Sequence, residues 1–323
     1  MKSLIAAVPM LLLGAAAPVA PPLRLSFPVA CTLGTDCVIQ NYPDDDPGPA
    51  ARDYACHGRT YQGHDGTDIR LPSMVAQRRG VNVLAVAAGT VLRARDGVAD
   101  RSIRDAPLGA ASGQECGNGL VIDHGGGWET QYCHMAQGSI AVRPGAQVKA
   151  GAVLGKVGLS GNTEFPHLHL TVRSNGKAVD PFAAGAPAGS CRGGKSLWAT
   201  TPAYREGEVL VTGFADGPVT MGQVQNAGST PTPPPGRTTP LVAFAQAVGL
   251  QGGDVQRLIL SGPGGAVVAD NRAEPLDRDK AQVILFTGRK AQAGGWPAGR
   301  YTAAYSVTRG GKVVITRSWA MTL

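Results

Sequence analysis

The sequence of 323 residues has few aromatic and few charged side chains, 5% and 16% of the total. No apolar run after residue 17 approaches the length needed to cross a bilayer, so we expect no stable membrane span. The net charge of +7 favours an anionic surface or polymer, but no dense Lys/Arg tract with interleaved aromatics occurs, and we expect no nucleic-acid binding. No two cysteines have the C-x-x-C spacing typical of zinc or thioredoxin sites.

What the sequence does contain is glycine (45), proline (24) and an apolar fraction of 43% made mostly of Ala, Val and Leu. This mixture predicts short strands joined by many turns, and the length allows two domains. The six cysteines form an even set, which indicates disulfides and an exported protein, periplasmic or extracellular. Six cysteines permit fifteen pairings. Only the pair Cys116–Cys133 is predicted from local sequence, by the hairpin described below.

Composition divides the chain into four parts. Residues 1–20 carry a short apolar run after Lys2 and predict a signal peptide. Residues 21–60 hold three cysteines and predict an irregular leader tied by disulfides. Residues 61–190 alternate apolar runs with glycine turns and predict an antiparallel β domain. Residues 195–323 contain neither histidine nor cysteine; their regularly spaced strand patterns predict an immunoglobulin-like β-sandwich without catalytic chemistry, whose ligand the sequence does not identify.

One hairpin is predicted in detail. Residues 119–124 pair naturally with residues 128–134 across Gly125-Gly126-Gly127, because glycines supply the positive φ of such turns. In that register Cys116 and Cys133 come close enough to form a disulfide.

Histidines supply the candidate chemistry. In a strand, residues two apart share a face, so His167 and His169 project together while Leu168 and Leu170 face a core. His64 and Asp68, separated by a bend at Gly66, can be directed at the same ion. Catalytic zinc takes about three ligands of these types and keeps one position open.

A fifth group completes the set. In Tyr132-Cys133-His134 the same alternation places His134 on one face with Tyr132, where an unbound imidazole beside the metal can accept a proton. His124 is expected to serve a structural hydrogen-bond network, and His57 to lie exposed in a loop. Asn118 and Thr130 either line the cleft or occupy polar hairpin positions.

Residues 61–182 resemble the zinc metallopeptidases of the lysostaphin and LytM family (peptidase family M23). The similarity lies in the following segments, in the order typical of the family: HDGTDI at 64–69, VLAVAAGTV at 83–91, GNGLVIDH at 117–124, YCHM at 132–135, VKAGAVLGKVGLSGNT at 148–163, PHLHL at 166–170, and Asp180-Pro181. Departures are Leu170 in place of an aromatic residue, Glu164-Phe165 in place of a Gly-rich pair, and an apparent insertion at residues 96–116.

The resemblance implies a LytM-type fold in which His64, Asp68 and His169 bind zinc. His134 and His167 would then be the catalytic pair, moving a proton and stabilising the oxyanion while zinc activates water. The implied function is an endopeptidase that cuts the peptide stems cross-linking bacterial peptidoglycan. Two alternatives remain: a non-catalytic cell-wall-binding or regulatory protein on the same fold, and a zinc hydrolase acting on exported proteins.

The leader offers a further hypothesis. Asn41, or one of Asp44 to Asp46, could reach the zinc and hold the enzyme latent, as pro-segments do in some relatives. The same three carboxylates lack the glycine and glutamate positions of an EF-hand, so a solvated turn is expected there and not a calcium loop.

Overall fold

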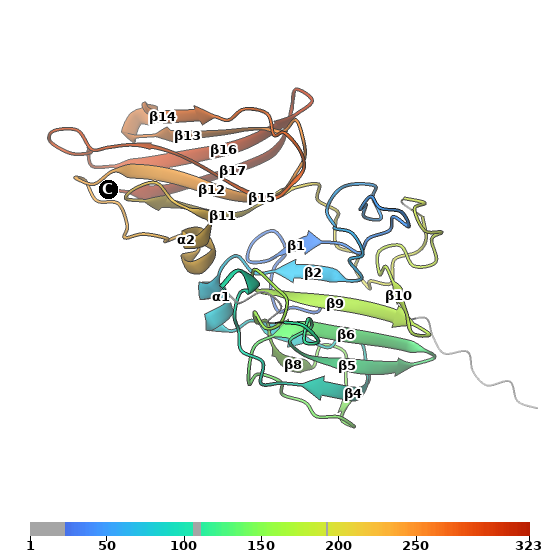
Figure 1. The fold of residues 1–323 in the computed structure, drawn as a ribbon. Helices are drawn as coiled ribbons and strands as arrows, with labels where there is room; N and C mark the ends of the chain where they lie inside the picture. Colours follow the sequence, from blue (N-terminus) through green and yellow to red (C-terminus); the bar gives the residue numbers. More distant parts are fainter. Residues whose placement is uncertain (1–22, 106–110, 192) are drawn as a thin grey trace, which may run out of the picture.

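The computed structural model describes residues 23–105, 111–191 and 193–323, so the predicted signal peptide lies outside the described residues. Strands dominate and helices are short, which confirms the mainly β fold class (Figure 1). Two groups of sheets are visible, one formed before residue 180 and one after residue 207. Among the described residues, no helix combines the length and the apolar character needed to cross a membrane.

The first group is built on an eight-stranded antiparallel sheet with the order β1-β2-β9-β6-β5-β4-β7, in which β10 also pairs with β9. Its strands are β1 (Val38–Asn41), β2 (Thr67–Arg70), β4 (Gly89–Arg95), β5 (Asn118–Gly125), β6 (Trp128–Met135), β7 (Gln147–Val148), β9 (His167–Ser174) and β10 (Lys177–Val179). A small sheet of β3 (Asn82–Leu84) and β8 (Val153–Lys156) accompanies it. The helical segments of this group are α1 (Met74–Arg79) and a 3-10 turn at Ile103–Asp105.

The main sheet has one apolar face and one polar face. Along β9, Leu168, Leu170 and Val172 are buried in the core, as their alternation predicts. The histidines between them therefore project from the opposite face. This division places the chemistry of the chain on one surface of the sheet.

The β5–β6 hairpin is confirmed. Leu120 pairs with Tyr132 and Gly125 with Trp128. Gly126 and Gly127 have φ of 60° and 80°, a left-handed conformation that glycine adopts without strain. The predicted Cys116–Cys133 disulfide is present and joins the start of β5 to β6.

Residues 23–60 are an integral part of this core. Its strand β1 pairs with β2, and Leu25, Ile39 and Tyr42 are buried with the residues of the main sheet. Disulfides join Cys31 to Cys37 and Cys56 to Cys191. The leader is therefore tied by disulfides, as expected, but it also supplies a strand and buried side chains.

The second group consists of two sheets that face each other across their own core. One sheet has the order β11-β12-β15 and the other β14-β13-β16-β17. Their strands are β11 (Glu208–Ala215), β12 (Leu241–Leu250), β13 (Val255–Ser261), β14 (Val267–Arg272), β15 (Lys280–Arg289), β16 (Arg300–Arg309) and β17 (Lys312–Thr322), with α2 (Met221–Ala227) and a 3-10 turn at Pro263–Gly265.

This part is a β-sandwich of seven antiparallel strands, as the sequence predicts. On β16 the alternating residues Tyr301, Ala303, Tyr305 and Val307 are all buried in the sandwich core. The strand order differs from the constant-type immunoglobulin arrangement in one respect. The fourth strand, β14, pairs with the third strand and not with the fifth.

The sandwich packs against the leader strand and α1. Helices α1 and α2 face each other (Figure 1), and Val38 of β1 is buried with Leu210 and Val211 of β11. Arg59 is buried and donates to a carboxylate oxygen of Glu208 at 3.2 Å. The contact therefore combines apolar packing with a buried ion pair.

Candidate active site

Three potential metal ligands converge where β2 and β9 pair. Asp68 and His169 are directly opposite each other in the register, and His64 lies one bend before β2. Asp68 Oδ1 lies 3.2 Å from His64 Nε2 and 2.9 Å from His169 Nδ1, and these two nitrogens are 3.2 Å apart. All three predicted ligands are therefore brought together, with His64 and Asp68 buried.

This triangle fits a zinc ion. With ligand bonds of about 2.0–2.1 Å, tetrahedral geometry separates neighbouring donor atoms by roughly 3.3–3.4 Å. The observed separations of 2.9–3.2 Å need only a small expansion. Two imidazoles and one carboxylate are also the donor types that catalytic zinc takes.

Each potential ligand is oriented by a second contact. His64 Nδ1 lies 2.8 Å from the Tyr42 carbonyl oxygen, which only accepts, so Nδ1 carries the proton and Nε2 keeps its lone pair for an ion. Asn41 Nδ2 donates to Asp68 Oδ2 at 2.9 Å and so turns Oδ1 toward the imidazoles. Neither orienting contact was predicted from the sequence, because both partners, Tyr42 and Asn41, lie in the leader, which was expected to be irregular.

Asp65 is a further contact that the sequence analysis missed. Its Oδ1 lies 3.2 Å from His169 Nε2, and Thr171 Oγ1 lies 3.0 Å from the same nitrogen. Arg173 in turn donates to Asp65 Oδ2 at 3.4 Å. Strand periodicity could have predicted this contact. Thr171 and Arg173 follow His169 at two-residue steps on β9 and so share its face, and Asp65 adjoins His64.

The electrostatics of the triangle favour the ionised forms of Asp68 and His169. Burial opposes ionisation of Asp68, but the surrounding His167 and His64 outweigh it and hold the pKa of that carboxyl well below its usual range. Burial likewise opposes the charged form of His169. Its hydrogen bonds to Asp65 and Asp68 prevail and raise the pKa of His169 to about 9.

Gly66 is needed for space next to these ligands. A Cβ at this position would lie 2.5 Å from His169 Nε2 and 2.8 Å from the Leu170 carbonyl oxygen. Both distances are shorter than any ordinary contact, so a side chain here would displace the ligand strand. The glycine of the H-x-G-x-D motif thus permits the close approach of β9.

His134 reaches the site through a β-bulge. Tyr132 is fully buried in the core opposite Leu170, so regular alternation would turn His134 into the core as well. The β5–β6 register shifts between Asn118 and Leu120, and His134 has a φ of 61°. The prediction that Tyr132 and His134 share a face is therefore wrong, because the bulge redirects the imidazole.

The protonation of the two remaining histidines follows from their contacts. His134 Nδ1 lies 2.8 Å from the Ser160 carbonyl oxygen, and His167 Nδ1 lies 2.9 Å from that of Phe165. Each Nδ1 therefore donates, and Nε2 is the proton-accepting nitrogen of each neutral ring. Burial, followed by the neighbouring His167 and His169, holds the pKa of His134 well below its usual range, so this ring is neutral at pH 7.

His134 and His167 are adjacent, with ring centroids 4.6 Å apart. His167 Nε2 lies 3.3 Å from Asp68 Oδ1, next to the ligand triangle. Thr163 Oγ1 lies 3.0 Å from His167 Nδ1 and helps to fix that ring. The five residues singled out in the sequence thus form one cluster.

A cavity of about 240 Å³ opens over this cluster. It is lined by residues of the segment before β2, of β6 and β9 and of two loops, and by the disulfide: Tyr61, Asp65, Glu115, Cys116, Gln131, Cys133, His134, Asn162, His169, Thr171 and Arg173. Tyr61 is 54% exposed and lies against the His64 ring at a centroid distance of 4.4 Å. The cavity is open to solvent on a polar face of the sheet.

The other candidates are structural. His124 contacts the Ala88 carbonyl and Thr130 Oγ1, which confirms its expected place in a hydrogen-bond network. Asn118 and Thr130 are fully buried and do not line the cavity. His57 was expected to be exposed, but it is half-buried because its ring stacks on Tyr204.

In the acidic turn of the leader, the Asp44 carboxylate accepts hydrogen bonds from nearby backbone amides. Asp44 Oδ1 accepts from the amides of Asp46 and Arg52, and Asp44 Oδ2 accepts from the amide of Gly63. This pattern agrees with the expected turn. Two of the proposed latency residues contact a potential ligand: Asn41 donates to the carboxylate of Asp68, whereas Asp44 meets His64 through the backbone, its amide donating to the His64 carbonyl oxygen at 2.7 Å.

Residues 62–181 match the model of peptidase family M23, which confirms the resemblance to the lysostaphin and LytM family. Three curated relatives are DD-carboxypeptidase/endopeptidase Mpg of Neisseria meningitidis (39% identical over 71 residues), peptidoglycan DD-endopeptidase ShyB of Vibrio cholerae (37% over 124) and cell division protein DipM of Caulobacter vibrioides (32% over 128). The matches cover 22%, 38% and 38% of this chain but only 16%, 24% and 17% of those proteins.

Proposed function

We propose that this chain is an exported, zinc-dependent endopeptidase that hydrolyses peptide cross-links of bacterial peptidoglycan. The observation that carries the proposal is the donor triangle of His64, Asp68 and His169 beside two imidazoles, those of His134 and His167, whose Nδ1 atoms are held by backbone carbonyl oxygens. The M23 match and the DD-endopeptidase relatives support the substrate class. Three disulfides support export.

Zinc held by the triangle would supply a Lewis acid that polarises the scissile carbonyl and lowers the pKa of water. His134 is neutral, and its Nδ1–H is anchored to Ser160, so Nε2 takes a proton from the attacking water. Once charged, the same ring returns the proton to the leaving amine. No side-chain nucleophile is needed.

His167 has a complementary task. Thr163 and the Phe165 carbonyl hold its Nδ1, so its Nε2 is fixed beside the ligand triangle. This Nε2 is thereby placed to stabilise, by a hydrogen bond, the oxygen that becomes negative in the transition state. A non-catalytic wall-binding protein would not require either imidazole in this arrangement.

We further propose that residues 61–190 act as the peptidase domain and residues 195–323 as a binding or spacer module. Because β1 and the buried leader side chains belong to the main core, the peptidase requires residues 21–60 to fold. The sandwich contributes no residue to the cavity over the histidine cluster.

The direct test is mass analysis of the products released from purified peptidoglycan by the protein with and without a chelator. We expect soluble peptide fragments with a new amine and a new carboxyl terminus, and none after chelation. Digestion of casein in place of sacculi would redirect the proposal to exported proteins. Sacculus binding without any cleavage would favour the non-catalytic alternative.

A further inference from the structure

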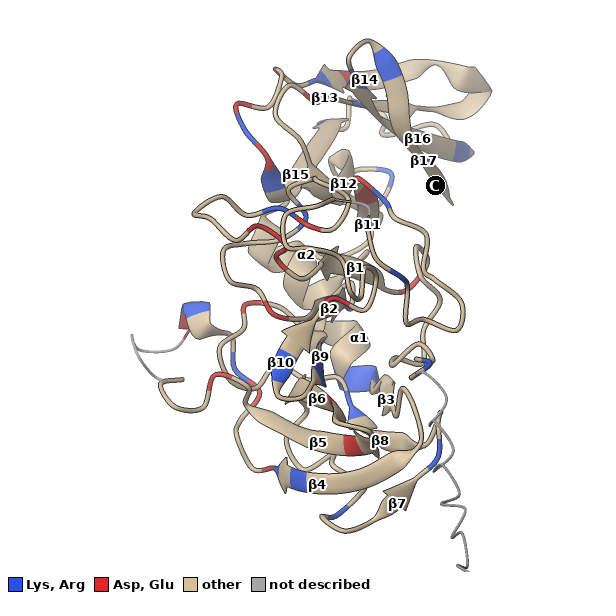
Figure 2. Cartoon of the chain, turned by 90° about the vertical axis from the view of Figure 1, so that its right-hand side faces the viewer, with Lys and Arg blue, Asp and Glu red and all other residues tan. Residues whose placement is uncertain are grey.

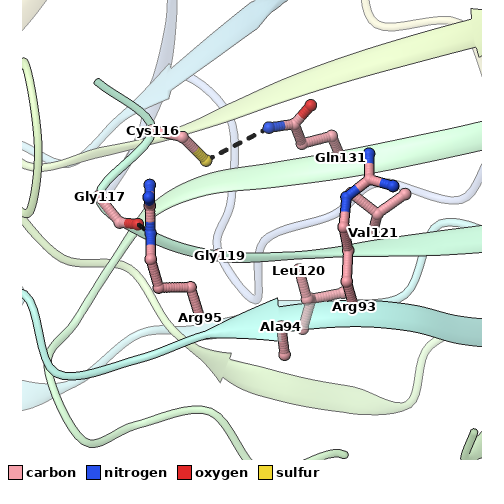
Figure 3. Close-up of a pocket in the computed structure, with 9 residues that line it drawn as sticks. All are labelled: Arg93, Ala94, Arg95, Cys116, Gly117, Gly119, Leu120, Val121 and Gln131. Atoms are coloured by element: carbon pink, nitrogen blue, oxygen red, sulfur yellow. Dashed lines mark hydrogen bonds between the residues drawn. The ribbon is translucent and has the colours of Figure 1, made fainter. Parts of the chain in front are cut away.

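The cavity over the histidine cluster continues across the sheet. Figure 3 shows the residues that line a second cavity, of about 250 Å³, which shares Cys116 and Gln131 with the first. Gln131 Nε2 lies 3.4 Å from Cys116 Sγ at this junction. The two cavities are therefore adjacent; together, and called the groove below, they extend from β9 over β6 and β5 to β4.

The far end of the groove is basic. Arg93 and Arg95 come from β4, and in Figure 3 both guanidinium groups rise from that strand on the side where Gln131 and Cys116 lie. Gly119 lies across from Arg95 and Val121 across from Arg93, and both line the cavity. Figure 2 shows basic bands on β4 at this edge of the sheet.

Both arginines are available to a ligand. They are exposed, and among the described residues neither forms an ion pair with a carboxylate. Arg95 Nε donates to the Gly117 carbonyl at 2.7 Å, which fixes its guanidinium at the groove. Arg173 at the near end differs, since it already donates to Gln131 and Asp65.

The strand register gives the distance between the two ends. His169 pairs with Cys133, the bulge sets Cys133 and His134 against Gly119, and Gly119 pairs with Arg95. Three strand spacings of about 4.8 Å separate His169 from Arg95, roughly 14 Å in all. An extended peptide covers this distance with about four residues.

We propose that Arg93 and Arg95 form a subsite for a free carboxylate of the peptide being cut, about four residues from the scissile bond. Paired guanidinium groups recognise carboxylates through charge-assisted, often bidentate hydrogen bonds. The inference rests on the proposed function and narrows its substrate to carboxylate-bearing stem peptides. An uncharged oligoglycine bridge has no group for this subsite.

The test uses one cross-linked stem peptide in two forms, with its free carboxylates intact or converted to primary amides. For the full chain with zinc we expect kcat/KM to be about tenfold higher for the carboxylate form, the lower end for a hydrogen bond to a charged group. The Arg93→Gln/Arg95→Gln double variant should cleave both forms at the slower rate. Arg143→Gln, an exposed arginine of the same part of the chain, should keep the tenfold preference.

A second arm measures equilibrium binding of both peptides to the inactive His134→Ala variant, with and without the two arginine substitutions. The Arg93→Lys/Arg95→Lys variant should regain part of the preference, because it keeps the charge and loses the bidentate geometry. A preference that survives in the double Gln variant overturns the subsite while leaving the peptidase function intact. Failure of the wild-type protein to cleave either peptide refutes the proposed function and the subsite with it.

An anionic wall polymer is the competing occupant of the same pocket. Polyphosphate serves as the probe for it. If the double Gln variant loses polyphosphate binding while its preference between the two peptides is unchanged, the pocket binds a polymer and the carboxylate subsite is refuted.

Discussion

Asp65→Asn tests whether the ligand His169 is tuned by a neighbouring carboxylate. In the structure Asp65 Oδ1 lies 3.2 Å from His169 Nε2 on the side away from the triangle. A carboxylate there makes the imidazole a stronger donor toward zinc and fixes its orientation. The asparagine keeps the size of the side chain and a possible hydrogen bond but removes the charge.

The expected size of the effect follows from exposure. Loss of such an outer contact typically costs 10- to 100-fold in metal affinity. The Asp65 side chain is 49% exposed, so solvent screens its charge and we expect about tenfold weaker zinc binding. Thr171, which also contacts Nε2, should limit the loss of ring orientation.

Zinc affinity of the Asp65→Asn variant is measured by competition with a chromophoric chelator at pH 7. Asp105→Asn, an exposed carboxylate on a 3-10 turn, serves as the matched control and should bind zinc like the wild type. Equal zinc affinity of the Asp65→Asn and wild-type proteins, with unfolding curves that coincide, would refute the role of Asp65.

Three further predictions concern the support of the site. Replacing Cys116 and Cys133 by alanine should lower the free energy of unfolding by about 3 kcal/mol, as for other loops of similar length, measured by urea denaturation. It should also lower kcat more than it raises KM, because the His134 amide donates to the Cys116 carbonyl; equal kcat would contradict this. In the metal-free protein the pKa of His169 is raised to about 9, so protonated His169 stabilises the folded state. This contribution to the free energy of unfolding, about 3 kcal/mol, is complete below pH 6.5 and is lost as the pH rises through 9. His169→Gln should remove this dependence in urea titrations at pH 6 to 10, and a slope that remains would assign it elsewhere. Asn41→Ala should weaken zinc binding, because Asp68 loses the donor that orients it; a rise in peptidase activity would instead support a latent leader.

The sequence is sufficient to predict how the candidate ligands are arranged, because their arrangement follows strand periodicity. His167 and His169 project from β9 opposite buried leucines, and Asp68 lies directly across from His169. The β5–β6 hairpin and its disulfide also follow from local signals, since three glycines set the turn and the turn sets the register.

Other features depend on contacts that periodicity does not encode. The bulge at His134 turns its side chain to the face of the sheet opposite to the one that alternation predicts. The residues Tyr132-Cys133-His134 contain no sequence signal for a bulge. The pairing of Cys56 with Cys191 spans 135 residues and needs the folded core. The basic end of the groove becomes visible only once the lateral register places Arg95 across from Gly119.

The leader shows the same limit in another way. Its many turn residues suggest an irregular segment, yet Leu25 and Tyr42 are fully buried against the main sheet. Deletion of residues 21–55 would therefore remove β1 and part of the core, and loss of activity in such a variant would report unfolding. Substitution of Asn41 alone separates latency from folding.

The central claim is that His64, Asp68 and His169 hold zinc while His134 moves the proton. Its most direct measurement is the zinc content per chain, together with turnover on purified peptidoglycan, for His169→Ala and His134→Ala. The account predicts that His169→Ala loses both stoichiometric zinc and activity, whereas His134→Ala keeps one zinc per chain and loses turnover. Full activity in either variant would contradict it.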